Sequence, residues 1–209
     1  EDEDWEVAGI AARELAEGGS PEARVPLLRL ALTAPCNQLA TAAAESAARL
    51  AGNVVAEDLE KKLVGKELDS ALLCLHVARR TLASPPPAGP RLERLVQEGG
   101  TSPADLRALR ALVAGVRSAD RERYVALLRD ASACRRAVAL EETQAAADLE
   151  LLCAAWKILA AGEPEFVERR LVQLAVRTLA VATAVQGTDP SLRDFLERSK
   201  PISAAPGRA

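Results

Sequence analysis

The residue types that most often carry enzymatic chemistry are scarce in this sequence. His76 is its only histidine, which excludes most pairings of a nucleophile with a histidine base and most histidine-rich metal sites. Cys74 lies two positions away, but on one helix the two side chains would point in very different directions. We therefore expect His76 to be a partly buried structural residue.

The four cysteines give no sign of a metal site. They occur at positions 36, 74, 134 and 153, and no two have the Cys-x-x-Cys spacing typical of zinc ligands. Each lies in an apolar or alanine-rich stretch. We expect reduced thiols that pack as small hydrophobic side chains in an intracellular protein, with no metal and no cofactor.

Acidic clusters and paired glycines are the remaining candidates for catalysis. The Gly-Gly pairs at 18–19 and 99–100 follow expected helices rather than strands, so they indicate helix ends and not phosphate-binding loops. Acids at this density are typical of the solvated face of a helix. The acidic clusters are Glu57, Asp58 and Glu60, and Glu141, Glu142, Asp148 and Glu150. An enzyme is the least favoured of the hypotheses.

Arginines and two aromatic residues provide the candidates for binding. Arg129 and Arg136 would lie two turns apart on one helix and could line a groove for an acidic peptide, although neighbouring acids could also pair with them. The acidic N-terminal segment around Trp5 could be a second interaction segment. The candidate protein-binding residues are Trp5, Arg121, Tyr124, Arg129, Arg136, Arg169 and Arg170.

The elements that must position these residues are helices. Hydrophobic residues make up 49% of the chain but aromatic residues only 2%, a composition that suits helices packed through small side chains. Apolar residues recur at helical spacing, as in Leu106, Leu109 and Leu112, and no segment alternates as a strand does. We predict an all-α fold without sheet and about nine or ten helices. The expected ranges are 4–17, 21–33, 37–51, 55–83 with a break near Gly65, 91–98, 103–117, 120–138, 140–161, 164–186 and 190–199.

Composition also suggests how the chain is divided. The proline-rich segment 84–90 cannot be helical and is typical of a linker or a long surface loop. Residues 201–209 read as a disordered tail, and residues 1–200 as a single helical-repeat domain. The opening without methionine suggests a piece of a longer chain.

One sequence pattern recurs along the chain. In it, an expected helix ends at glycine and the next helix begins at serine, proline or an acid. It occurs at 15–23, at 95–105 and, shortened, at 159–165, and an apolar stripe such as Leu27, Leu28 and Leu30 follows each time. This recurring pattern resembles the inter-helix turns of HEAT and armadillo repeats. The resemblance implies an α–α superhelix that acts as a binding scaffold, and it carries no functional residue. The turn glycines are unevenly spaced, so an irregular helical bundle remains the alternative.

Net charge and hydropathy limit the choice of partners. The net charge of −3 argues against a general nucleic-acid binder, which needs a clustered cationic surface. No apolar run approaches the roughly 18 residues that cross a bilayer, and the acidic opening differs from a signal peptide. We expect a cytoplasmic or nuclear location.

Taken together, the residues favour a non-enzymatic scaffold or adaptor that binds a partner protein, or an acidic or amphipathic peptide, in a helical-repeat groove. The alternative is a compact helical bundle that regulates an enzyme or assembles with copies of itself. For that alternative the nearly uncharged stretch 171–185 could supply the homo-oligomer contact, although burial in the centre of the fold would also explain it.

Overall fold

The computed structural model describes residues 3–114 and 121–146, together with the single positions Leu151, Ala154, Ala155, Ile158 and Ala161. Every regular element in these residues is helical, which confirms the predicted all-α class. The chain divides into two compact units, Glu1–Val116 and Arg117–Ala209, and we describe each by itself. A single domain over residues 1–200 stays a prediction, and the expected tail at 201–209 lies outside the described residues.

The described part of the chain is a succession of helices. Two of them are preceded by a 3-10 turn, η1 (Pro21–Ala23) before α2 and η2 (Gly65–Glu67) before α5. The first unit contains α1 (Glu3–Glu17), α2 (Arg24–Thr33), α3 (Asn37–Ala51), α4 (Asn53–Lys61), α5 (Leu68–Thr81), α6 (Pro90–Glu98) and α7 (Pro103–Val113). The second unit contains α8 (Arg121–Leu128) and α9 (Ala133–Ala146). Within these parts of the chain, no helix is both long and apolar enough to cross a bilayer.

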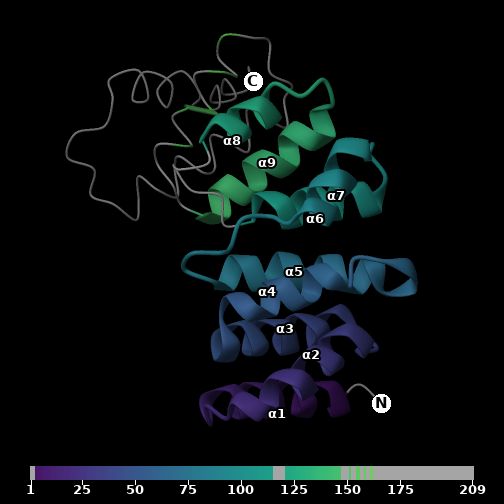
Figure 1. Cartoon of the computed structure of the whole chain (residues 1–209), viewed down its shortest axis with the longest axis vertical. Coiled ribbons are helices and arrows are strands. Elements are labelled where there is room, and N and C mark those ends of the chain that lie inside the picture. Colours follow the sequence, from purple (N-terminus) through teal and green to yellow (C-terminus); the bar gives the residue numbers. More distant parts are fainter. Residues whose placement is uncertain are drawn as a thin grey trace, which may run out of the picture. The chain divides into compact units, whose positions relative to one another are not determined.

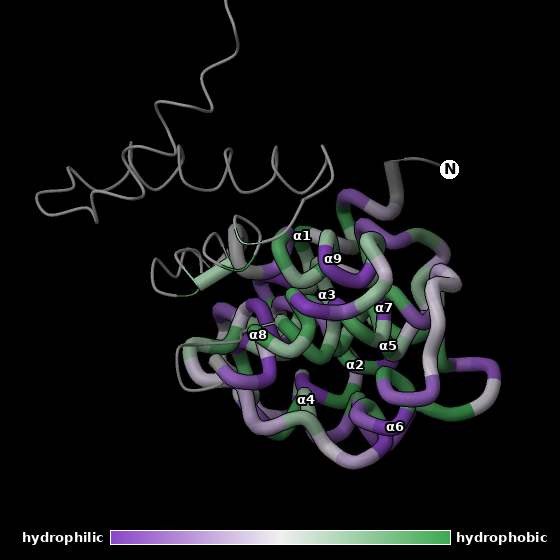
Figure 2. The backbone as a smooth tube through the Cα atoms, turned by 90° about the horizontal axis from the view of Figure 1, so that it is seen from above, coloured by the Kyte–Doolittle hydropathy of each residue, from purple (hydrophilic) through white to green (hydrophobic). Residues whose placement is uncertain are grey.

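In the first unit the odd-numbered helices pack in the order of the sequence. Helix α3 packs against α1 and α5, and α5 packs against α7. Helices α2, α4 and α6 pack on α3, α5 and α7 respectively, so that each forms a pair with the helix that follows it. Figure 1 shows these pairs one after another along the unit. Hydrophilic and hydrophobic residues alternate along the helices in Figure 2, as expected of helices that bury part of their surface.

Small side chains let α3 sit between its neighbours. Six of its eight buried residues are alanines, and Ala43, Ala44 and Ala47 are fully buried. On the side of α1, a Cβ atom placed on Gly9 would lie 3.9 Å from the Cβ atom of Ala42, so the two helices approach closely there. The aliphatic composition therefore permits close contacts between helices, in place of a core filled with large aromatic side chains.

We expect Ala47→Leu to destabilise the first unit, because a leucine at this fully buried position must displace a neighbouring helix. Overpacking of this kind costs about 1–3 kcal/mol of unfolding free energy. Urea unfolding followed by circular dichroism measures the change. Gln38→Leu, at an exposed position of the same helix, is the matched control and should change the stability little. Equal effects of the two substitutions would show that the packing at α3 is not tight.

The proline-rich segment is a surface loop held to the first unit rather than a linker between units. Residues 82–89 are without helix, and Pro90 begins α6. The Glu60 carboxylate of α4 accepts hydrogen bonds from the backbone N–H groups of Gly89, at 2.8 Å, and Leu92, at 3.4 Å. Arg79 of α5 donates to the carbonyl of Pro86 at 2.7 Å. Because Gly89 has no side chain to cap α6, Glu60 supplies the cap from another helix.

Removal of this cap should weaken the loop and the start of α6. We expect Glu60→Ala to lower the free energy of unfolding by about 1–2 kcal/mol, the usual cost of losing a helix N-cap. Glu57→Ala, at an exposed position of the same helix, is the control. Urea unfolding measures the stability, and hydrogen exchange at the backbone amides of residues 89 and 91–93 locates the change. Unchanged exchange at these amides would contradict the capping role.

The largest error of the sequence reasoning lies in the second unit. A single helix was predicted over 120–138, whereas α8 ends at Leu128 and α9 runs from Ala133 to Ala146. Asp130 accepts a hydrogen bond from the N–H of Ser132 at 2.9 Å, and the Ser132 hydroxyl accepts one from the N–H of Arg135 at 3.4 Å. These local bonds compete with helical ones and end the helix. The boundary expected at 138–140 is wrong for the same reason, because α9 begins earlier and continues through it.

The other helix boundaries of the first unit lie close to the predicted ones. Gly65, at φ +62°, interrupts the long expected helix 55–83 and separates α4 from α5. Ser102 and Asp105 form a reciprocal capping box at the start of α7, as the Ser-Pro signal suggests. The expected helices 164–186 and 190–199 lie outside the described residues.

Candidate functional site

The aromatic residues predicted at a binding surface are not freely exposed. Tyr124 of α8 is only 1% exposed, so a partner could reach its ring only after a rearrangement, and the surface role expected of it does not fit this structure. Trp5 of α1 is half-buried. It precedes the buried Gly9 and Ala12 by four and seven residues, which places it on the inward face of the helix.

The proposed arginine ridge is not assembled as predicted. Arg129 lies in the turn after α8 and Arg136 lies on α9, so they do not share the face of one helix. One guanidinium nitrogen of Arg136 donates to the carbonyls of Asp130, at 2.7 Å, and Ala131, at 3.2 Å. Arg136 therefore stabilises the turn. Arg129 is exposed, whereas the side chain of Arg121 and all of Arg169, Arg170 and residues 171–185 lie outside the described part.

The thiols divide into a buried and an exposed class. Cys74 of α5 is fully buried, and its Sγ donates to the carbonyl of Ala31 at 3.4 Å. Burial raises the pKa of Cys74 to about 12, so it stays protonated and is a poor nucleophile. Cys36 is half-buried and Cys134 is exposed, and the expectation of a packed thiol is therefore wrong for Cys134. Cys153 lies outside the described residues.

This difference predicts selective labelling. At pH 8 in the folded protein we expect N-ethylmaleimide to modify Cys134 rapidly and Cys74 only after unfolding, because the reagent needs an accessible thiolate. Peptide mass spectrometry measures the extent of modification at each site over time. A sample in concentrated urea, in which all cysteines should react, is the control. Equal rates at Cys74 and Cys134 in the folded protein would contradict the placement of Cys74.

The remaining candidates for catalysis are dispersed or have structural roles. His76 is half-buried on α5. Glu60 caps α6, and Glu57 and Glu141 are exposed. No group of three or more histidine, cysteine or acidic side chains in the described residues could hold a metal ion.

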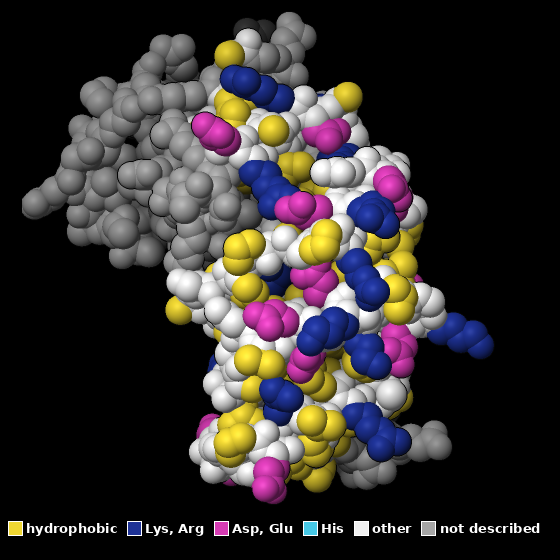
Figure 3. All heavy atoms as spheres, in the orientation of Figure 1, with side chains coloured by type: hydrophobic (Ala, Val, Ile, Leu, Met, Phe, Trp, Pro, Cys, Tyr) yellow, Lys and Arg dark blue, Asp and Glu magenta, His cyan; other side chains and the backbone are white. Residues whose placement is uncertain are grey.

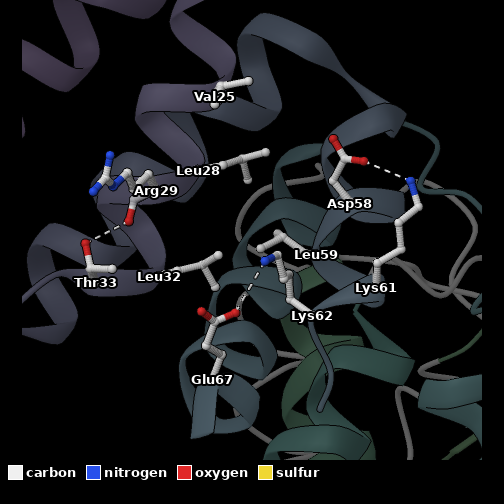
Figure 4. A pocket seen from close by; sticks show the side chains of 10 residues that line it. All are labelled: Val25, Leu28, Arg29, Leu32, Thr33, Asp58, Leu59, Lys61, Lys62 and Glu67. Carbon is white, nitrogen blue, oxygen red and sulfur yellow. Dashed lines mark hydrogen bonds and ion pairs between the residues drawn. The ribbon is translucent and has the colours of Figure 1, made fainter. Parts of the chain in front are cut away.

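A groove lies between α2 and α4 in the described part of the first unit. We call it the α2–α4 groove; its volume is about 440 Å³. Leu59 of α4 is fully buried beneath it, whereas Leu28 and Leu32 of α2 are half-buried. Figure 4 shows Leu28 and Leu32 pointing into the groove from one side. The lining residues are Val25, Leu28, Arg29, Leu32, Thr33, Asp58, Leu59, Lys61, Lys62 and Glu67.

The spacing of residues on α2 explains why this groove stays open. Leu27 and Ala31 are buried, and they form the face that packs inward. Val25, Leu28 and Leu32 are separated by three and four residues, so they form a second apolar face beside the first. Val25 remains 62% exposed. Helix α2 thus has more apolar surface than its neighbours cover.

The rim of the groove carries more positive than negative charge. Lys61 pairs with Asp58 at 3.0 Å, and Lys62 pairs with Glu67 at 3.6 Å. Arg24, at the start of α2, also approaches Asp58, at 3.9 Å. Both lining acids therefore already have cationic partners, and Arg29 adds a further cation. Exposed pairs of this kind are worth about 0.2–1 kcal/mol, so carboxylates of an incoming partner can compete for the lysines.

Sequence reasoning missed this site, although a signal for it was present. The recurring turns predict only that Leu27, Leu28 and Leu30 form one apolar stripe. The apolar residues from Val25 to Leu32 in fact cover more than one face of a ten-residue helix, and such an excess indicates a second contact. The lysine pair at 61–62 gives no such signal in the sequence, because only the fold brings it beside α2.

No protein-family model matches the chain, and no curated protein matches it significantly. The similarity to HEAT and armadillo repeats therefore stays a prediction.

Proposed function

We propose that this chain is a non-enzymatic protein-interaction module whose α2–α4 groove holds a segment of a partner protein. One observation carries the proposal. The groove combines an open apolar surface, formed by Val25, Leu28 and Leu32, with a rim that carries three cations and two acids. Apolar anchors supply most of the affinity in such contacts, and complementary charges supply specificity.

The arrangement of the helices supports a scaffold role. In this proposal the successive pairs α2–α3, α4–α5 and α6–α7 are hairpins of a HEAT/armadillo-like α–α superhelix. One such pair cannot bury its apolar faces alone, and contacts of α3 with α5 and of α5 with α7 provide the missing cover. Stacked pairs of this kind form a rigid support, which reduces the entropy lost on binding.

The chemistry of the groove favours an acidic, amphipathic partner segment. Leucine-like side chains would fill the space above Leu59, and flanking carboxylates would approach Lys61 and Lys62. A helix that presents apolar residues three and four positions apart fits a groove between two helices. This refines the acidic or amphipathic peptide expected from the sequence and moves its site from the arginines of α8 and α9 to α2 and α4. We place the interaction in the cytoplasm or nucleus.

The alternative remains a compact helical bundle that regulates an enzyme or assembles with copies of itself. No feature of the described residues favours an enzyme regulator over the scaffold, and the stretch 171–185 that could supply the homo-oligomer contact lies outside them.

A pull-down with quantitative mass spectrometry tests the groove. We expect the Lys61→Glu/Lys62→Glu variant to retain at least tenfold less partner protein than the wild-type chain. The charge reversal places four acids at one side of the groove and therefore repels an acidic segment. Circular dichroism should show that the variant is folded, since both lysines are exposed.

The matched control reverses two charges elsewhere in the same unit. Lys66→Glu/Arg94→Glu changes the net charge equally, and neither residue lines the groove. It should retain the same proteins as wild type. If the groove variant retains them too, or if the control loses them equally, the groove is not the binding site.

A further inference from the structure

Helix α1 carries the most exposed apolar surface of the described residues. Val7, Ile10 and Leu15 are 65%, 56% and 49% exposed. Val7 and Ile10 are three residues apart, and Glu14 follows four residues later, so these side chains share the face opposite to Gly9 and Ala12. Helix α1 packs inward on α3, and among the described residues Val7 and Ile10 are exposed on its opposite face. Figure 3 shows hydrophobic side chains at the end of the first unit that α1 forms, with acidic ones beside them.

This helix is also strongly acidic. It contains five acidic residues and one arginine, and the side chains of Glu6, Glu14 and Glu17 are exposed. Helix α1 thus combines an apolar stripe with flanking carboxylates. These are the two properties that the α2–α4 groove requires of its occupant.

We infer that the α2–α4 groove binds helix α1 of a second copy of this chain. Ile10 and Val7 would enter the apolar part of the groove beside Leu28 and Leu32. Glu14 would approach Lys61 and Lys62 and compete with the exposed partners of these lysines. The inference rests on the proposed function, because it names an occupant for the same groove.

The geometry of the contact determines how such an assembly can grow. Helix α1 and the groove are different surfaces of one chain, so the contact is heterologous. If each α1 docks in the groove of the other copy, the two contacts together form an isologous interface that closes at a dimer, whereas one-way contacts can add further copies. In both cases α1 and a partner protein would compete for one groove, and self-association would limit access of the partner.

Complementation between two defective variants tests the inference in the full chain. Ile10→Asp destroys the α1 face, and Lys61→Glu/Lys62→Glu destroys the groove. Multi-angle light scattering should show that wild type associates beyond its 22.1 kDa monomer mass. For each variant alone, the dissociation constant of self-association should rise at least about tenfold. In Ile10→Asp a charge replaces the apolar side chain that enters the groove, and in Lys61→Glu/Lys62→Glu the new acids repel α1. An equimolar mixture should recover a dimer, since one variant retains the groove and the other retains α1.

Three results would overturn the inference. They are a monomeric wild type at high concentration, loss of association by only one of the two variants, and a mixture that stays monomeric. Val54→Asp, which introduces the same charge at an exposed apolar position outside the groove, should leave association unchanged. The pull-down separates this inference from the proposed function. A monomeric wild type that still retains partners through Lys61 and Lys62 would refute self-association and leave the function standing.

Discussion

Close packing of small side chains at α3 is the constraint on which the first unit depends. Alanine at 43, 44 and 47 is fully buried, and this lets α1 and α5 approach α3 from different sides. Each alanine buries little area, so stability must come from many contacts between neighbouring helices rather than from a few large side chains. Among the described residues, α1 keeps Val7 and Ile10 exposed on its outer face, and α2 keeps Val25 exposed.

The α2–α4 groove follows from that arrangement. Helix α2 buries Leu27 and Ala31 in the unit and leaves Leu28 and Leu32 toward α4. Two long-range polar contacts hold the other side of the groove. Glu60 caps α6, and Arg91 of α6 donates to the carbonyl of Lys61 at 2.8 Å. The carboxyl end of α4, with its lysine pair, is therefore fixed in place by the element that follows the proline-rich loop.

Charge distribution matters more for this protein than its total charge. The chain is close to neutral, with a net charge of −3, and on the face drawn in Figure 3 cations and acids lie among one another. Local differences remain, because α1 carries five acids and one arginine, whereas the rim of the groove carries three cations and two acids. In the second unit, by contrast, Arg135 pairs with Asp130 at 2.8 Å and Arg136 binds turn carbonyls. These arginines serve the turn between α8 and α9.

The sequence by itself determined the helical class, the proline-rich break and most helix ends of the first unit, because these depend on periodicity and on caps within a few residues. Ser102 and Asp105 are an example, since they bond to each other. It did not determine the end of α8, where Asp130 and Ser132 outweigh helical spacing, nor the burial of Tyr124. Only the tertiary structure decided the binding surface. Leu28 and Lys62 are 34 residues apart, and no local rule states that packing on α3 and α5 brings α2 and α4 to one groove.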